Sequence, residues 1–350
     1  MDIRSEFNDL LADIEAEMQS VLDGRRGSHT EPLYAQLAYH LGIDRSDGSR
    51  GKRLRPLLGL LAYASLAGDY RKALPGAAAV ELGHNFSLVH DDIEDADRER
   101  HHRPTLWAIW GVPLAINAGD ALFALSRLAL YRLLADFSEH KVLALMRVYD
   151  ETCLALCEGQ FLDITFERQP DVSVPQYLEM IGKKTAALIG ASVQAGAILA
   201  TDDEATIEAY RRFGWNLGLA FQMADDVKGT FWSSAESGKP EAGDVRKRKK
   251  TMPVVWAMEH APAADAARLR RLYGPAMVAT DGSRPPDDEP LGEAEVREVV
   301  AILDRCAARQ HVLDEAHRHR DAALADIDAL PLDEERRRQL RELVGAVIAA

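Results

Sequence analysis

The stretch that decides the fold runs from residue 81 to residue 95 and reads ELGHNFSLVHDDIED. Its mainly apolar first part leads directly into the acidic residues, as expected at the end of a buried helix. On such a helix Asp91 and Asp95 project from one face about 6 Å apart along the axis, and Asp92 points about 100° away. Two like charges on one face repel unless a cation lies between them. The segment predicts a divalent-cation site, and a solvated acidic face is the alternative that it leaves open when taken alone.

A second acidic segment, residues 225–229 with the sequence DDVKG, follows an apolar helical stretch in the same way. Position 229 is Gly, so Asp225 has no carboxylate partner four residues further on. Asp225 is therefore the one clear inward carboxylate, and Asp226 is expected to act through water or a lysine. Mg²⁺ needs few carboxylates, because it keeps several waters and binds substrate phosphates.

Local groups of lysine and arginine surround the two acidic segments. Residues 51–56, GKRLRP, open a predicted helix, where cations oppose the helix dipole and are not explained by helix stability. A bound anion would use both these side chains and the free backbone N–H groups. Gly182, inside a long apolar helix, predicts a kink that turns Lys184 and Thr185 into a cavity. Further cations lie at residues 238–240 and 247–250. Divalent metal beside cations indicates diphosphate chemistry with Mg²⁺.

Composition narrows the class of protein. The net charge of −14 argues against nucleic acid as a partner. The three cysteines show no disulfide pattern, so a cytoplasmic location is expected. The longest apolar stretch, residues 185–200, is shorter than the roughly 20 residues of a membrane span, and the first residues have no apolar signal core. No transmembrane segment is predicted, and residues 185–200 are expected to form a helix that is buried all round.

Helical periodicity runs through the whole chain, and alternation typical of strands is nearly absent. Without an internal repeat or a shift in composition, we predict one all-α domain over residues 1–350, a bundle with long central helices. Residues 273–291 are predicted to form an exposed surface loop. The first 23 residues also carry apolar side chains at helical spacing. The predicted helices are Glu31–Leu41, Leu54–Ala67, Ala73–Asp95, Thr105–Ala135, Lys141–Phe166, Val174–Leu199, Asp203–Phe231, Thr251–Glu259, Glu293–Arg318 and Leu332–Ile348.

From about residue 51 to residue 253 the chain resembles the trans-isoprenyl diphosphate synthases, the polyprenyl synthetase family, in its geranylgeranyl and farnesyl diphosphate synthase-like members. The resemblance rests on an ordered series of motifs rather than on one acidic segment. In the family's order they are residues 51–56, 81–92, 103–105, 159–163, 184–185, 221–226, 238–240 and 244–253. The resemblance implies antiparallel helices around a central cavity, the type I isoprenoid synthase fold.

The resemblance also implies a reaction and its residues. An allylic diphosphate ionises, isopentenyl diphosphate attacks the carbocation, a proton leaves to the departing diphosphate, and the chain grows by five carbons. Three Mg²⁺ ions, with Mn²⁺ as an alternative, would be held with the substrate by Asp91, Asp95 and Asp225, and by Asp226 in second line. The cations on the allylic diphosphate would be Arg100, Lys184 and Lys239, and Thr185 and Gln222 would stabilise the carbocation. The isopentenyl diphosphate site would comprise Lys52, Arg55, His84 and His101. Lys249 falls at a further phosphate site, for which Lys247 or Lys250 are alternatives.

Two positions depart from the family pattern. His101 stands where an arginine of the isopentenyl diphosphate site is usual, which implies a weaker and pH-sensitive phosphate contact. Gly229 stands where the second acidic motif usually ends in Asp. The missing carboxylate bears on whether every Mg²⁺ position is filled, and it bears less on whether the chain has the family's function.

Product length depends on packing below the first acidic segment. Phe86 lies five residues before Asp91, on a roughly similar face, and its ring is predicted to form the floor for the growing chain. Ser87 is too small to narrow the pocket further. In the family this combination implies a C20 product first and a C15 product second, and the family is typically homodimeric.

Two alternatives remain for the activity. A class I terpene cyclase would share the fold and the ionisation step, but its second motif ends in Glu, whereas Asp226 and Thr230 are followed by Ser234. A non-catalytic partner subunit should have lost carboxylates or phosphate-binding cations, and only Gly229 and His101 point that way.

Overall fold

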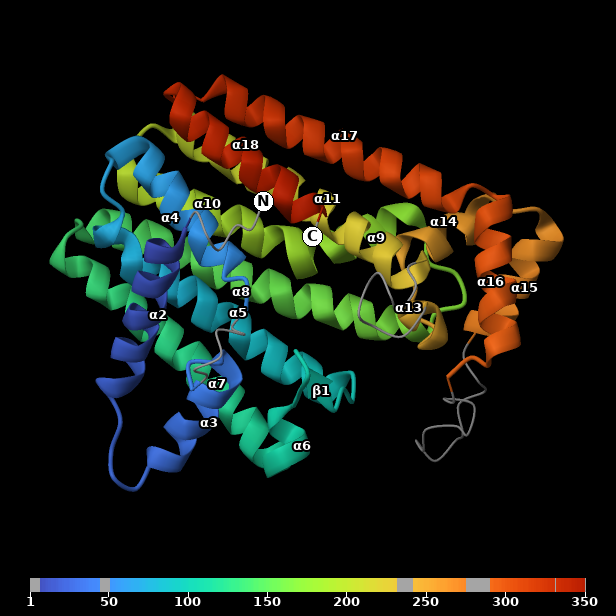
Figure 1. Ribbon diagram of the computed structural model, residues 1–350, viewed down its shortest axis with the longest axis horizontal. Helices are drawn as coiled ribbons and strands as arrows, with labels where there is room; N and C mark the ends of the chain where they lie inside the picture. Colours follow the sequence, from blue (N-terminus) through green and yellow to red (C-terminus); the bar gives the residue numbers. More distant parts are fainter. Residues whose placement is uncertain (1–6, 45–50, 232–241, 275–289, 331, 350) are drawn as a thin grey trace. The chain divides into compact units, whose positions relative to one another are not determined.

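The computed structural model describes residues 7–44, 51–231, 242–274, 290–330 and 332–349. The described chain is overwhelmingly α-helical, which confirms the predicted all-α class (Figure 1). In this part of the chain the β-structure consists of one two-stranded antiparallel hairpin, in which Glu99 pairs with Pro104 and Arg100 with Arg103.

The elements up to residue 135 include the hairpin and the first long helices. Three short segments, η1, α6 and η2, connect or extend the longer helices. The bounds are α2 (Asn8–Asp23), α3 (Glu31–Leu41), α4 (Leu54–Ala67), η1 (Arg71–Ala73), α5 (Leu74–Glu94), β1 (Glu99–Arg100), β2 (Arg103–Pro104), α6 (Leu106–Trp110), α7 (Val112–Tyr131) and η2 (Arg132–Ala135).

The remaining elements include the longest helices, α8 and α11. The bounds are α8 (Glu139–Arg168), α9 (Val174–Ile181), η3 (Gly182–Ala186), α10 (Ala187–Ala200), α11 (Glu204–Phe231), α13 (Gly243–Arg246), α14 (Met252–His260), α15 (Ala263–Tyr273), α16 (Glu293–Arg305), α17 (Ala308–Ala329) and α18 (Glu334–Ala349).

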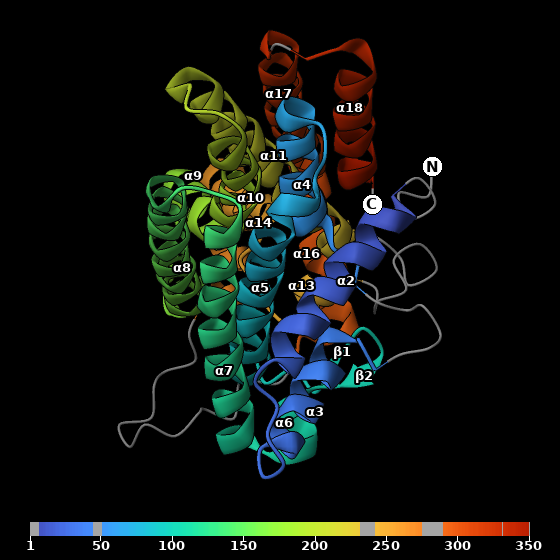
Figure 2. The ribbon, with the colours of Figure 1, turned by 90° about the vertical axis from the view of Figure 1, so that its left-hand side faces the viewer.

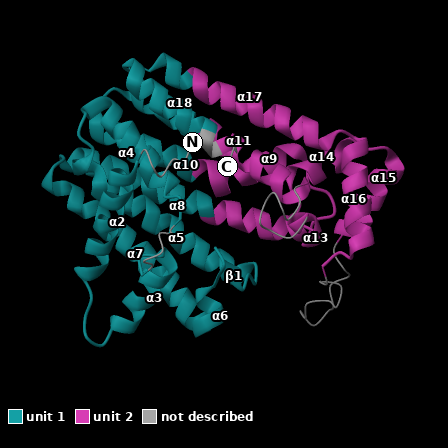
Figure 3. Ribbon diagram, in the orientation of Figure 1, with its two compact units in different colours: residues 1–156, 188–214, 326–346 teal, residues 157–187, 215–325, 347–350 magenta. Residues whose placement is uncertain are grey.

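The chain divides into two compact units, coloured separately in Figure 3. Unit 1 comprises residues 1–156, 188–214 and 326–346, and unit 2 comprises residues 157–187, 215–325 and 347–350. Helices α8, α11 and α17 each contribute to both units. The single domain and the central cavity that the sequence predicts stay predictions.

Helix α5 is the core element of unit 1. It packs side by side with α7, as Figure 2 shows, and also contacts α2 and α4. Ala77, Ala78, Ala79 and Leu82 of α5 are buried. The three alanines let neighbouring helices approach closely, because their side chains are small. The first acidic segment therefore stands at the end of a rigid, buried helix.

Unit 2 contains two apolar clusters. One gathers buried residues of α14, α15 and α16, including Val254, Leu269 and Val299. The other joins the ends of α8 and α9 to α11, with Phe166, Tyr177 and Met223. This second cluster surrounds the carboxyl-terminal part of α11, where the second acidic segment lies.

Two helices predicted as continuous are interrupted. Gly111, with φ of 81°, separates α6 from α7, since this left-handed conformation suits glycine and ends the helix. Cys306 and Ala307, with Ala307 at φ of 54°, separate α16 from α17. The predictions of unbroken helices over Thr105–Ala135 and Glu293–Arg318 were wrong, because helical periodicity continues across both breaks.

The kink predicted at Gly182 is present as a π-helical segment, η3, between α9 and α10. The prediction of a fully buried helix after it is confirmed, since nearly every residue of α10 is buried. A π-helical turn inserts one extra residue per turn and re-aims its side chains, and such segments are frequent at functional sites.

Helices α13 and α15 fall where no helix was predicted. Tyr273 ends α15 and is 2% exposed, and Leu291 is 1% exposed, so the ends of the predicted surface loop are core residues. The prediction of exposure was wrong at these ends, and residues 275–289 lie outside the described part. Among the described helices, none is long and apolar enough to cross a membrane.

Candidate active site

The first acidic segment forms the last turn of α5. Asp95 is the carboxyl-terminal cap, and its N–H donates to the Asp91 carbonyl at 2.8 Å. Asp91 and Asp95 are half-buried and one helical turn apart, whereas Asp92 is only 2% exposed. Asp92 thus points away from the face that Asp91 and Asp95 share, as the sequence predicts and helical geometry requires.

Asp92 holds the predicted allylic-diphosphate cation Arg100. The Arg100 Nε donates to Asp92 Oδ1 at 2.8 Å, across the start of the hairpin. Burial raises the pKa of Asp92 to about 6, although the neighbouring Arg100 opposes that rise. Asp92 Oδ2 is buried and has no hydrogen-bond partner within the described residues. Asp92 thus positions a cation beside the acidic pair.

His101 and His102 form the turn of the hairpin, both exposed and with φ of 50° and 60°. Two successive left-handed residues give the backbone twist that a two-residue hairpin needs. The Thr105 hydroxyl and the Trp107 Nε1 both donate to the Asp97 carbonyl, at 2.9 and 2.8 Å, and fix the hairpin's base. The fold therefore presents His101 on a short, anchored turn next to Arg100.

Arg55 and His84 of the predicted isopentenyl diphosphate site lie together. Arg55 Nη1 is 3.0 Å from His84 Nε2. Burial, with Arg55 as the next cause, lowers the pKa of His84 well below its usual value, and burial also lowers that of Arg55. Lys52 is exposed at the turn that precedes α4. An anion placed here would relieve the repulsion between these groups.

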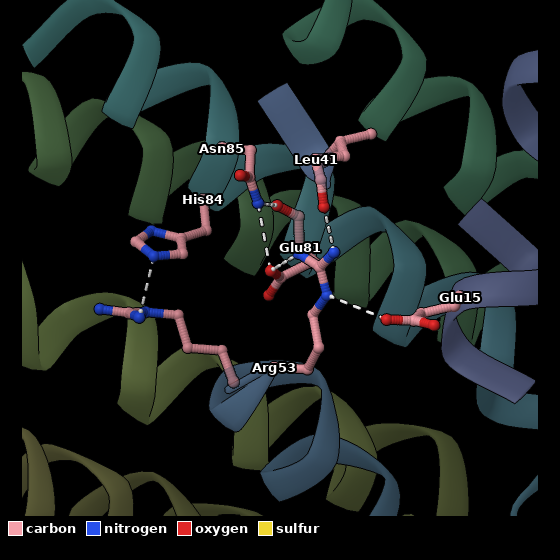
Figure 4. A network of polar contacts seen from close by, with 7 residues as sticks. Glu15, Leu41, Arg53, Glu81, His84 and Asn85 are labelled. Carbon is pink, nitrogen blue, oxygen red and sulfur yellow. Dashed lines mark hydrogen bonds and ion pairs between the residues drawn. The ribbon is translucent and has the colours of Figure 1, made fainter. Parts of the chain in front are cut away.

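Arg53, which the sequence analysis did not single out, anchors this turn (Figure 4). It is 5% exposed, takes a left-handed φ of 50°, and pairs with Glu81 at 2.8 Å. Its guanidinium also donates to the Leu41 carbonyl, and Glu15 lies 4.0 Å away. Asn85 Nδ2 donates to Glu81 at 3.1 Å. The one sequence signal was Glu81, a carboxylate inside an otherwise apolar helix.

The second acidic segment lies on α11. Asp225 is exposed, and Asp226 is 3% exposed. The sequence predicts Asp225 as the inward carboxylate of this segment, but the buried carboxylate is Asp226. Gln222 Nε2 donates to Asp226 Oδ1 at 3.0 Å. The other oxygen, Oδ2, accepts from the Met252 N–H at 3.0 Å and from the Tyr177 hydroxyl. Burial raises the pKa of Asp226 to about 7. Asp226 organises the packing here, and its role as a metal ligand stays a prediction.

Gly229, the departure in the second motif, lies against another carboxylate. A Cβ at position 229 would come within 1.8 Å of Asp244 Oδ2 and 2.6 Å of its Cγ. Asp244, from α13, thus fills the space that a side chain at 229 would need. The charge missing from the motif is supplied nearby by a residue that motif spacing does not reveal.

The π-helical segment joins Lys184 and Thr185 to neighbouring helices. A Cβ at Gly159 of α8 would come within 2.4 Å of the Lys184 N, so only glycine permits this approach, and Lys184 pairs with Asp163. The Thr185 hydroxyl donates to Gln222 Oε1 at 2.7 Å. Since Gln222 in turn donates to Asp226, its amide orientation is fixed and the Thr185 lone pairs remain available.

Two predicted phosphate-site cations have different surroundings, and a third lies outside the described residues. Lys249 is half-buried after α13. Lys250 is 7% exposed. It donates to the Phe166 carbonyl at 2.6 Å and to the Gln169 carbonyl, at the end of α8. Lys250 therefore caps that helix and does not suit the phosphate-binding role for which it was the alternative to Lys249. Lys239 is the residue that the structure does not describe.

Phe86 is 8% exposed and packs edge-on against Phe123 of α7, with ring centroids 5.1 Å apart. The His90 ring also lies edge-on to it, with ring centroids 6.0 Å apart. The ring is thus one member of an aromatic cluster below Asp91. Neighbouring aromatics restrict its motion, as the floor of a chain pocket requires.

The carboxylates suit Mg²⁺ better than a cation that takes all of its ligands from the protein. The described residues contain no cluster of three or more acidic, histidine or cysteine side chains arranged to hold a metal. The outward pair Asp91 and Asp95, the exposed Asp225 and the unpartnered Oδ2 of Asp92 supply few, hard oxygen donors. Mg²⁺ needs few protein oxygens, because water and substrate phosphates complete its octahedron.

Residues 43–282 match the polyprenyl synthetase family model, and the chain belongs to this family of prenyltransferases. It is 44% identical over 283 residues to a geranylgeranyl diphosphate synthase of Mycobacterium tuberculosis, covering 79% of each chain. It is 36% identical over 330 residues to a (2E,6E)-farnesyl diphosphate synthase of Mycobacterium bovis, covering 93% of this chain and 87% of the relative. The crystal structure of geranylgeranyl pyrophosphate synthetase from Pyrococcus horikoshii matches with a TM-score of 0.86 at 31% identity, over 99% of this chain and 98% of that one. The protein is a trans-prenyl diphosphate synthase with the isoprenoid synthase fold.

Proposed function

We propose that this enzyme condenses isopentenyl diphosphate with an allylic diphosphate and releases mainly the C20 product, with C15 second. The observation that carries the proposal is the pairing of predicted phosphate cations with carboxylates that do not belong to the outward acidic set. Asp92 holds Arg100, and Asp163 holds Lys184. Such pairs fix the cations before the substrate arrives, and preorganised charge is what an ionisation step needs.

The two acidic segments are proposed to act with these cations on the allylic diphosphate. When bound, Mg²⁺ would neutralise the negative charge that develops on the leaving diphosphate, held by Asp91, Asp95 and Asp225. Arg100 and Lys184 would bind oxygens of the same diphosphate, together with Lys239. Arg and Lys donors suit this role because charge-assisted hydrogen bonds to phosphate are strong.

The oxygens of Thr185 and Gln222 are proposed to face the carbocation. The Thr185 hydroxyl donates a hydrogen bond to Gln222 Oε1, so its lone pairs are left to stabilise positive charge. The Gln222 amide is held by Asp226, which prevents its Nε2 donors from turning toward a cation. The departing diphosphate accepts the final proton, and no side chain is assigned as the base.

Lys52, Arg55, His84 and His101 are proposed to bind isopentenyl diphosphate. The pairing of Arg55 with His84 supports this site, because Arg55 donates to His84 Nε2 and not to a carboxylate, which leaves its positive charge uncompensated by this contact. The anchored Arg53 turn holds Lys52 and Arg55 in register with α5.

The product length is tested by one incubation series. Purified protein with Mg²⁺ and isopentenyl diphosphate is given dimethylallyl, geranyl or farnesyl diphosphate, and the dephosphorylated products are weighed by mass spectrometry. Linear C20 and C15 alcohols are expected. Replacement of Phe86 by Ala should lengthen the products by one or more units, since it removes the floor. Cyclic hydrocarbons made without isopentenyl diphosphate would instead indicate a terpene cyclase. Absence of turnover with every primer would indicate a non-catalytic partner subunit.

The enzyme is further proposed to form a homodimer through the outer faces of α7 and α8. Leu143, Leu154 and Phe161 recur at spacings that place them on one face of α8 and are 64%, 61% and 66% exposed. On α7, Leu128 and Tyr131 are also exposed. A second copy could cover this face by two-fold symmetry. Sedimentation should show a dimer, and Leu154→Glu should yield monomer.

A further inference from the structure

His40, in the last turn of α3, has a ring nitrogen without a partner. Its Nε2 is buried and makes no hydrogen bond within the described residues. The ring also bonds the backbone of Asn85 on α5, which must involve Nδ1 because Nε2 has no partner. A buried, unpartnered nitrogen costs folding free energy, so it needs an explanation.

Two arginines and two histidines from three elements surround this ring. Arg53 precedes α4, His84 lies on α5, and Arg100 and His101 belong to the hairpin. Burial first, and then Arg100, lower the pKa of His40 to about 3. Burial penalises the charged imidazole, and the Arg100 guanidinium repels it.

The carboxylates nearby are already engaged. Glu81 pairs with Arg53 at 2.8 Å, and Asp92 pairs with Arg100 at 2.8 Å. His40 itself is therefore left facing cations. A polyanion placed among them would reverse the repulsion and favour the protonated imidazole.

The backbone at His40 is held from both sides. The hydroxyl of Tyr39 donates to the Pro104 carbonyl at 2.9 Å, and the Arg103 guanidinium lies 3.7 Å from the centre of the Tyr39 ring. The Leu41 carbonyl accepts from Arg53. His40 is thus fixed between the hairpin and the turn that carries Lys52 and Arg55.

We propose that His40 is a further binding residue for the diphosphate of isopentenyl diphosphate, and that it takes up a proton as that diphosphate binds. The proton comes from solvent onto Nε2, which then donates to a diphosphate oxygen. In this way His40 supplies the charge that is lost where His101 replaces the arginine usual in the family. The inference rests on the proposed isopentenyl diphosphate site.

Two substitutions separate the two ring nitrogens. His40→Asn keeps an amide donor near the position of Nδ1, toward Asn85, and removes the group at Nε2. His40→Gln places a donor near Nε2 that cannot titrate. His140→Asn, at an exposed position of α8, is the matched control.

The experiment is calorimetric titration of the full-length protein with isopentenyl diphosphate near neutral pH, in two buffers of different ionisation enthalpy. Wild type and His140→Asn should take up protons on binding. His40→Asn should raise the Kd about tenfold, as expected for the loss of one charge-assisted hydrogen bond. His40→Gln should raise it less, with reduced proton uptake. The Kd for geranyl diphosphate should not change.

Three results would overturn the proposal. One is an unchanged Kd for isopentenyl diphosphate in His40→Asn. Another is equal proton uptake by wild type and His40→Gln. The third is a parallel loss of affinity for both substrates together with a lower Tm, which would mark His40 as a packing residue. Turnover is measured separately: wild type that binds isopentenyl diphosphate without turnover refutes the proposed function and leaves the His40 proposal standing.

Discussion

The two acidic segments look alike in sequence but use their second aspartate differently. Both begin with an outward carboxylate, Asp91 and Asp225, and both continue with a buried one. Asp92 holds a cation, Arg100, whereas Asp226 accepts hydrogen bonds from Tyr177, Gln222 and a backbone N–H.

The two aspartates of each adjacent pair therefore have different roles. The first of each pair is half-buried or exposed, whereas the second is buried and holds the groups around it. In α5 the held group is Arg100, which is proposed to bind phosphate, and in α11 it is the amide of Gln222. The segments also end differently. The first ends in Asp95, whereas the second ends in Gly229, beside which Asp244 fills the space.

The largest effects are expected at the outward carboxylates. Asp91→Asn and Asp225→Asn should each lower kcat about a thousandfold, because each removes charge from the proposed metal site. Steady-state assays and Mg²⁺ titration check both activity and metal binding. Glu94→Gln, at an exposed position of the same turn as Asp91, is the control. If Asp225→Asn kept most of its activity, the two segments would not be equivalent.

A side chain at position 229 should destabilise the protein. Gly229→Asp would force a carboxylate into the space of Asp244 and cost about 3 kcal/mol of unfolding free energy from overlap and charge repulsion. Denaturant unfolding measures the loss. The double variant Gly229→Asp with Asp244→Gly should recover most of it, and no recovery would show that the two positions do not share one space.

Loss of the buried carboxylate in α11 should cost less. Asp226→Asn leaves one of its donors unmatched and should lower the unfolding free energy by about 2 kcal/mol. The pKa of Asp226 is raised from 3.8 to about 7. Between these values the native state binds more protons than the unfolded chain, so wild-type stability should fall as pH rises through this window. A flatter pH profile for Asp226→Asn checks the cause, and an unchanged slope would contradict it.

The smallest change is expected at Asp92. Asp92→Asn keeps an oxygen for Arg100 and should cost about 1 kcal/mol of stability. Its pKa of about 6 gives the same direction of pH dependence as Asp226, over the narrower window between 3.8 and about 6. Because Asp92 positions Arg100, the KM for the allylic substrate should rise while the KM for isopentenyl diphosphate stays constant. An equal rise in both would show that Asp92 acts on the fold as a whole.

Much of the fold could be predicted, since apolar residues at helical spacing reveal helices locally. The bounds predicted for Glu31–Leu41 and Leu54–Ala67 agree with the structure, and the Gly182 kink was anticipated. Breaks at Gly111 and Ala307 were missed, because the periodicity continues through them and the interruption depends on backbone conformation.

The sequence proposed most of the candidate site residues, but it did not reveal the residues that hold them. Arg55 and His84 are in contact as the isopentenyl diphosphate prediction requires, and Lys184 has its charged partner. Arg53, Asp163 and Asp244 were not assigned, because motif spacing does not tell which carboxylate or cation turns inward.

By itself, the sequence determined the helical class, the order of the motifs and the chemistry of the acidic and basic side chains. These properties are local, since they depend on periodicity and residue type. Only the tertiary structure decided which charges are buried and paired. Asp92 and Asp226 are each next in sequence to Asp91 and Asp225, yet their roles follow from Arg100 and Tyr177, which only folding brings to them. Burial and partner choice are set by packing between distant segments, and that information is not carried by any short stretch of chain.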